Sequence, residues 1–112
     1  MTDTIFGKIA RREIPATIVA ESTRCIAFRD VAPQAPVHVL VVPKTAYATL
    51  NDVEDPSLLG ELLALARDVA RKEGLAEDGY RVVINTNANG GQTVFHLHAH
   101  VLGGRAMHWP PG

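Results

Sequence analysis

The stretch HLHAHVLGG, residues 96–104, constrains the fold more strongly than any other part of the chain. It places His96, His98 and His100 at every second position, with apolar residues between them. Because a β-strand sends alternate side chains to opposite faces, this alternation predicts a strand with one histidine face and one apolar face. The apolar face predicts a hydrophobic core on one side of a sheet, and the histidine face predicts a functional site on the other.

The composition is that of an ordinary globular protein. The chain has 112 residues, of which 46% are hydrophobic and 21% charged, and we expect one domain over residues 1–112. A net charge of −1 supplies no basic field for a nucleic-acid backbone or an anionic membrane, so neither is expected as a partner. Cys25 is the only cysteine, and neither a signal-peptide pattern nor a membrane-spanning apolar run is present. These features predict a cytoplasmic protein.

The pattern of the remaining elements favours an α+β fold. Residues 16–21, 24–30, 37–43, 80–86 and 93–103 have the composition of strands. The short links at 22–23 and 87–92 make the strands on either side of each link antiparallel neighbours. We therefore predict a five-stranded antiparallel sheet with one long and one short helix.

Both helices are indicated by their caps and apolar spacing. Asp55 and Pro56 are a typical cap and first residue of a helix that ends at Gly74. Its buried stripe is expected to contain Leu58, Leu62, Leu65 and Val69. The short helix carries Ile5, Phe6 and Ile9, ends before Pro15, and has Thr2, Asp3 or Thr4 as its cap.

Three interpretations of the histidine face are open from the residues alone. The first is a solvated strand face, although three of the five histidines then share it by chance. The second is a metal site, because His-x-His pairs are common zinc ligands. Alternate strand residues lie about 6.6 Å apart, so all three histidines reach one ion only if the strand bends. Two histidines then need a third ligand, for which Asp30 and His38 are candidates.

The third interpretation is a row of imidazoles that serves one extended anionic substrate. A neutral imidazole is a nucleophile toward phosphorus, and an imidazolium is a donor and acid near neutral pH. The preceding loop supports this interpretation, because Gly90 and Gly91 let backbone N–H groups approach an anion without a Cβ in the way. The loop also supplies uncharged polar side chains: Asn85, Asn87, Asn89, Gln92 and Thr93.

At this point the chain resembles a known family. HLHAHVL matches the His-x-His-x-His-x-x signature of the histidine-triad family, and the resemblance is strongest to its Hint branch of small nucleoside phosphoramidases. It extends over nearly the whole chain, through IFGKIARREIPA, FRDVAPQAPVHVLVVPK, GYRVVIN, GGQTVFHLHAHVLGG and MHWPPG. The resemblance implies hydrolysis of the P–N bond of purine nucleoside 5′-phosphoramidates through a nucleotidyl-histidine intermediate. It implies no metal and no other cofactor.

The resemblance also implies a role for each residue of the site. His98 is the expected nucleophile, His100 contacts the phosphate and the leaving group, and His96 and His38 complete the hydrogen-bonded set. The residues expected at the phosphate are Asn85, Gly91, Gln92 and Thr93. Asp30 is expected to hold the ribose hydroxyls. The expected base slot consists of Ile5, Phe6, Ile9, Phe28, Val31 and Leu40. Thr93 departs from the serine that is frequent in this branch, and its methyl group is expected to alter the leaving-group contact.

The resemblance further implies a homodimer whose C-terminal segment lies near the partner's active site. Trp109 is the only tryptophan, and its large apolar surface is expected to pack either on its own sheet or at that interface. The partner molecules expected are thus a purine nucleotide, similar to AMP or GMP, and a second copy of the chain.

Rival functions also fit parts of the sequence. Another histidine-triad chemistry, dinucleoside polyphosphate hydrolysis or nucleotidyl transfer, would use the same triad. A metal-dependent hydrolase would use the histidines as ligands, and a nucleotide-binding interaction module would need no catalysis. The WPPG tail and the run from Val101 to Gly104 favour the phosphoramidase branch.

Overall fold

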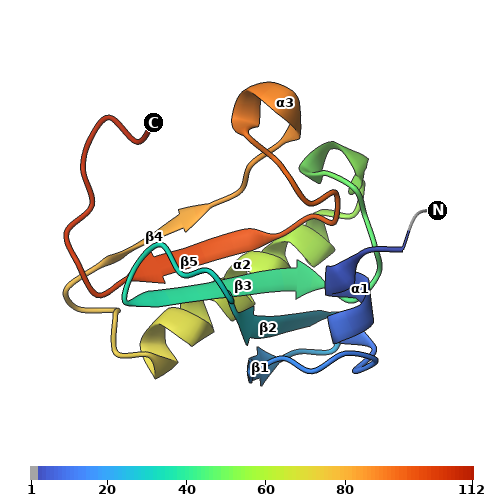
Figure 1. Cartoon of the computed structure of the whole chain (residues 1–112), viewed down its shortest axis with the longest axis horizontal. Helices are drawn as coiled ribbons and strands as arrows, with labels where there is room; N and C mark the ends of the chain where they lie inside the picture. The colour runs from blue at the N-terminus through green and yellow to red at the C-terminus, as the bar shows by residue number, and fades with distance from the viewer. Residues whose placement is uncertain (1–2) are drawn as a thin grey trace.

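The structure is a computed structural model that describes residues 3–112, and its central feature is a five-stranded antiparallel sheet (Figure 1). The strand order is β1-β2-β3-β5-β4, and every neighbouring pair is antiparallel. The strands are β1 (Ile18–Glu21), β2 (Cys25–Arg29), β3 (Val37–Pro43), β4 (Tyr80–Val83) and β5 (Ala99–Gly103). Together with the helices described next, this sheet confirms the predicted α+β class.

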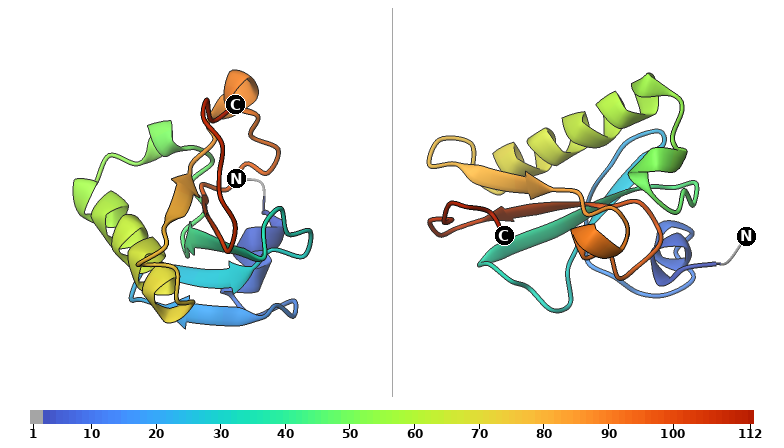
Figure 2. Two further views of the ribbon diagram at one scale, coloured as in Figure 1. Left: turned by 90° about the vertical axis from the view of Figure 1, so that its left-hand side faces the viewer. Right: turned by 90° about the horizontal axis from the view of Figure 1, so that it is seen from above.

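The long helix α2 (Pro56–Lys72) covers one face of the sheet (Figure 2). Asp55 caps it by accepting a hydrogen bond from the backbone N–H of Ser57 at 2.9 Å, and Pro56 occupies its first turn. Gly74, with φ of +76°, follows its end in the left-handed conformation that favours glycine. The predicted stripe is buried in full and packs on strand residues of the same face: Leu58, Leu62, Leu65 and Val69.

The short helix α1 (Ile5–Ala10) lies against the opposite face of the sheet. Its cap is Thr4, whose hydroxyl accepts a hydrogen bond from the N–H of Gly7 at 3.0 Å; of the other candidates, Thr2 lies outside the described residues. The apolar cluster between α1 and the sheet contains Ile9, Ile26, Phe28, Leu40 and Val42. Alternation along β2 and β3 therefore fills two separate cores, one on each face.

Four strands are shorter than the sequence predicted. β1 begins at Ile18 rather than 16, β4 ends at Val83 rather than 86, and β5 begins at Ala99 rather than 93. β2 spans Cys25–Arg29 rather than 24–30. The partner strand β3 ends at Pro43, which has no N–H to continue the ladder, and the N–H of Leu97 is bonded instead to the carbonyl of Tyr47 at 2.6 Å. The prediction that all three histidines lie on one strand was thus wrong in extent, because only His100 lies inside β5.

The segments that leave the sheet form two short helical turns. Residues expected to be an open loop form α3 (Asn87–Gly90), which ends at Gly91 with φ of +77°. A 3-10 turn, η1 (Leu50–Asp52), connects β3 to α2 and is closed by a capping box between Thr49 and Asp52. None of the described helices is long and apolar enough to cross a membrane.

The core beneath α2 yields a stability prediction. Leu62 is 0% exposed, so Leu62→Ala should lower the free energy of unfolding by about 2–5 kcal/mol through lost burial and a residual cavity. The matched control is Leu63→Ala on the same helix, where the side chain is 50% exposed and a change within about 0.5 kcal/mol is expected. Urea denaturation of both variants measures the difference. Equal losses at the two positions would contradict the packing described.

Candidate active site

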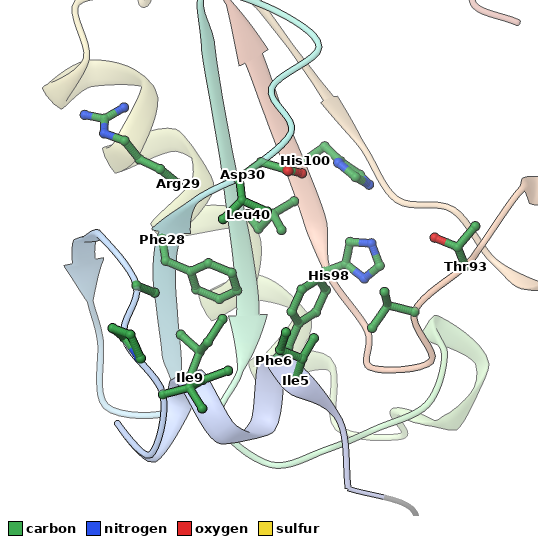
Figure 3. A pocket seen from close by; sticks show the side chains of 15 residues that line it. Ile5, Phe6, Ile9, Phe28, Arg29, Asp30, Leu40, Thr93, His98 and His100 are labelled. Carbon is green, nitrogen blue, oxygen red and sulfur yellow. The ribbon is translucent and has the colours of Figure 1, made fainter.

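A cavity of about 330 Å³ opens on the face of the sheet that α1 covers (Figure 3). Its lining includes ten residues that the sequence assigned to the site: Ile5, Phe6, Ile9, Phe28, Asp30, Val31, Leu40, Thr93, His98 and His100. Five further lining residues were not predicted: Ile14, Pro15, Ala16, Arg29 and Val94. Arg29 and Val94 are chain neighbours of predicted residues, whereas nothing in the sequence pattern marked 14–16.

The strand register explains why apolar and polar groups meet in this cavity. Phe28 is opposite Leu40 across β2 and β3, and Leu40 is opposite His100 across β3 and β5. Directly opposed residues share a face, so these three side chains form a row across the sheet. The α1 residues Phe6 and Ile9 cover the apolar end of the row. The cavity consequently has one apolar end and one end with imidazole, hydroxyl and carboxylate groups.

The tautomer of His98 follows from its one hydrogen bond. Nδ1 of His98 lies 2.7 Å from the backbone carbonyl of His96, and a carbonyl oxygen only accepts, so Nδ1 carries the proton. The lone pair of the neutral ring is then on Nε2. Burial lowers the pKa of His98 below its ordinary 6.5, against the His96 carbonyl and the negative Asp30, which both raise it. His98 is therefore a neutral imidazole with a free nitrogen at neutral pH.

The proton of His100 is assigned through His38. The backbone N–H of Gln34 donates to Nδ1 of His38 at 3.0 Å, so the His38 proton is on Nε2. Nε2 of His38 in turn lies 2.9 Å from Nδ1 of His100, which must accept, and the proton of His100 is left on its own Nε2. Burial, with the neighbouring rings of His98 and His38, lowers the pKa of His100 to about 4. His100 thus complements His98, since its Nε2 is a donor where that of His98 is a free base.

His96 is part of the framework and does not line the cavity. Its ring is 0% exposed, and Nε2 donates to the carbonyl of Pro43 at 2.8 Å. Nδ1 consequently accepts, and the hydroxyl of Thr4 lies 2.8 Å from it. Burial lowers the pKa of His96, which keeps the ring neutral. Residues 96–101 still alternate between the two faces as predicted, because Leu97, Ala99 and Val101 lie in the core under α2.

One group of residues at the cavity, of which Asp30 and His100 line it, has the composition of a metal site. Ligand atoms of Asp30, His38 and His100 all lie within 4.8 Å of one another. A metal would bind His38 through Nε2, and the neutral ring would then need its proton on Nδ1. That position is taken by the N–H of Gln34, which donates to Nδ1. The hydrogen bonding of His38 therefore does not fit a metal ligand.

The loop before β5 is held by Gln92, whose side chain is not part of the cavity lining. Its amide nitrogen donates to the carbonyls of Ala48 and Val94 at 2.8 and 3.1 Å, and its amide oxygen accepts from the N–H of Asn87 at 2.9 Å. The amide nitrogen and the amide oxygen of Gln92 are thus both hydrogen-bonded to backbone groups. Of the four residues expected at a phosphate, only Thr93 lines the cavity, while Asn85, Gly91 and Gln92 do not.

The C-terminal tail lies along β4 and β5 without burying its tryptophan. Arg81 of β4 donates to the carbonyl of His108 at 2.8 Å and holds the tail in place. Trp109 is 82% exposed, so of the two alternatives for this residue the packing on its own sheet does not occur, and the interface stays a prediction.

Comparison with known proteins was consistent at three levels. The family model described as the HIT domain matches residues 11–107. An uncharacterised HIT-like protein of Synechococcus elongatus is 62% identical over 112 residues, covering 98% of this chain and 97% of that protein. A protein of Escherichia coli K12 named purine nucleoside phosphoramidase is 50% identical over 107 residues, covering 94% and 90% of the two chains.

The solved structures agree with the sequence matches. The crystal structure of a HIT family hydrolase from Legionella pneumophila matches with a TM-score of 0.93 at 54% identity, covering 98% of this chain and 100% of that one. The resemblance inferred from HLHAHVL is thereby confirmed. Since the matched region contains the four buried or half-buried histidines of the site, the chain belongs to the HIT family.

Proposed function

We propose that this protein hydrolyses the P–N bond of purine nucleoside 5′-phosphoramidates. One observation carries the proposal: His98 is a buried neutral imidazole with a free Nε2, and its ring packs against Phe6 of the apolar end and against His100. The two rings are close, with centroids 4.9 Å apart. A relative 50% identical is named purine nucleoside phosphoramidase, which favours this reaction over others that the same triad could catalyse.

The two ends of the cavity suit the two ends of a nucleotide. A purine is flat and apolar on its faces, and the rings of Phe6 and Phe28, 5.4 Å apart between centroids, would contact it at the apolar end. Asp30 lines the cavity, with its Oδ2 3.4 Å from Nε2 of His38, and would offer its carboxylate to the ribose hydroxyls. Thr93 and His100 offer donors to the phosphate oxygens. Asn85, Gly91 and Gln92 would contribute to this end through the loop that they shape.

The proposed reaction has two displacements at phosphorus. Nε2 of His98 attacks, the P–N bond to the amine breaks, and the amine nitrogen receives a proton from His100 or Thr93. Water then attacks the nucleotidyl-His98 in line, the P–Nε2 bond breaks, and the proton of the water restores the acid. Products are the nucleoside monophosphate and the free amine. The bond from Nδ1 of His98 to the His96 carbonyl stabilises the positive ring of the intermediate.

The direct test of the function compares two substrate classes. Purified protein should release AMP from an adenosine 5′-phosphoramidate much faster than it cleaves a diadenosine polyphosphate. The reverse preference would assign a different reaction to the same histidines. A panel with different bases and amines would then define the preferred purine and leaving group.

The covalent mechanism predicts a specific effect of His98→Ala. The variant should retain nucleotide binding and lose more than about 10³-fold in turnover, because the bond-forming atom is gone. Mass spectrometry of wild-type protein quenched during turnover should find the nucleotide on the peptide that contains His98. A substrate chiral at phosphorus should react with net retention, since two inversions cancel. Net inversion together with loss of activity on chelation would instead support a metal-activated water.

The lowered pKa values predict how activity and stability depend on pH. Because burial holds the pKa of His98 below 6.5, the acid limb of kcat/KM should lie below pH 6.5. Unfolded histidines take up protons first as the pH falls, so the free energy of unfolding should decrease from pH 6.5 toward the His100 value of about 4. A pH–rate profile and urea denaturation at several pH values measure both. An acid limb at 6.5 or above would contradict a desolvated nucleophile.

We also propose that the active form is a homodimer in which the tail of one chain crosses to the other. Trp109 is exposed in the single chain, and the edge strand β4 presents the exposed side chains of Tyr80 and Val82. Such apolar groups at an open sheet edge are typical of an interface. Removal of residues 106–112 should weaken the dimer or change the amine preference, as measured by sedimentation and kinetics. A monomer of the intact protein at micromolar concentration would refute this proposal.

A further inference from the structure

Within residues 3–112, the hydroxyl of Thr4 makes the one side-chain hydrogen bond between the α1 segment and the histidines of the site. Thr4 precedes the helix, whereas His96 lies 92 positions later along the chain, and the contact between Oγ1 and Nδ1 is 2.8 Å. The other hydrogen bonds of the two groups determine which of them donates in this contact. Nδ1 of His96 must accept because Nε2 donates to the Pro43 carbonyl, and Oγ1 is free to donate because it accepts from the N–H of Gly7. The chain of bonds is therefore Gly7 to Thr4 to His96 to Pro43.

The next bond leads from His96 to the proposed nucleophile. The backbone carbonyl of His96 holds the proton on Nδ1 of His98 at 2.7 Å, and this bond leaves Nε2 of His98 free. The segment around His96 is outside the β-ladder, which begins at Ala99. The ring of His96, fixed by Thr4 on one side and Pro43 on the other, therefore restrains the part of the backbone on which the tautomer of His98 depends.

Helix α1 also contacts both histidines through Phe6. The ring of Phe6 packs edge-on against His98 and His96, with centroid distances of 5.1 and 6.2 Å. Phe6 lines the apolar end of the cavity together with Ile5 and Ile9 of the same helix. One short helix thus forms part of the ligand-facing wall and holds the ring that orients the nucleophile.

We infer that Thr4 is a positioning residue for His98, acting through the tautomer and orientation of His96. This inference rests on the proposed function for its kinetic consequence, but the hydrogen-bond chain itself can be tested without turnover. Without the hydroxyl, Nδ1 of His96 becomes a buried acceptor that has lost its donor. The ring and the adjacent carbonyl are then free to reorient, and the proton of His98 is no longer confined to Nδ1.

The test compares three variants. Thr4→Val keeps the shape of the side chain and removes the hydroxyl, whereas Thr4→Ser keeps the hydroxyl and removes the methyl group. Thr17→Val is the matched control, since Thr17 is exposed and its hydroxyl makes no hydrogen bond within residues 3–112. Circular dichroism and thermal denaturation establish that each variant is folded before it is compared.

The kinetic readout separates positioning from simple docking of the helix. Thr4→Val should lower kcat at saturating adenosine phosphoramidate by about tenfold, and it should also raise KM because α1 lines the cavity. Thr4→Ser should restore kcat to within about twofold of the wild type, and Thr17→Val should leave both constants unchanged. A higher KM with unchanged kcat in Thr4→Val would mean that Thr4 only docks the helix, and it would overturn the inference.

Nitrogen-15 NMR of the histidine rings supplies a readout that needs no substrate. In the wild type, His96 should show the Nε2–H tautomer and His98 the Nδ1–H tautomer. In Thr4→Val, the two nitrogens of His98 should shift toward the values of a mixed population, and in Thr4→Ser they should not. Unchanged His98 shifts in Thr4→Val would overturn the inference. If the wild type cleaves no phosphoramidate while these shifts behave as expected, the proposed function fails and the role of Thr4 stands.

Discussion

The buried ring of His96 is the point at which the parts of this molecule are joined. Its two nitrogens bond to the cap of α1 and to the last residue of β3, and its carbonyl bonds to His98. A buried polar ring is costly unless both of its nitrogens are paired, so the chain must bring Thr4, Pro43 and His96 together for the fold to be stable. The arrangement that satisfies this ring also orients the neighbouring histidine toward the cavity.

The two faces of the sheet have different roles, since one carries the main core and the other carries the candidate site. The face under α2 holds the larger apolar core, which includes the residues that alternate with the histidines, Leu97, Ala99 and Val101. The other face holds a smaller apolar cluster next to the row of imidazoles. Because strands alternate, each of β2, β3 and β5 contributes to both faces, and a shift of register by one residue would exchange core and site. The firm core on one side therefore fixes the register on which the site depends.

Most of the framework could be predicted from the sequence, because caps and apolar spacing are local signals. Asp55, Gly74 and the α2 stripe were predicted correctly, as was the antiparallel sheet. The late start of β5 could not be foreseen, because it depends on Pro43, which lies in a partner strand far away in the sequence. The same holds for Thr4, which the sequence indicates only as a helix cap, whereas its contact with His96 spans almost the whole chain. The role of Gln92 as an internal brace likewise depends on carbonyls of other segments.

The groups that set the histidine tautomers are mostly main-chain atoms. Carbonyls of Pro43 and His96 and the N–H of Gln34 make three of these bonds, and no side-chain substitution deletes a carbonyl. The proton positions are thus encoded in the path of the backbone. Such a site tolerates substitution of the surrounding side chains. It does not tolerate a change in chain length near positions 34, 43 or 96, because an insertion or deletion there would remove several of these bonds together. Related chains should accordingly vary in side chains around the site while keeping the spacing of these segments, with the Thr4 hydroxyl as the exception that sequence drift can remove.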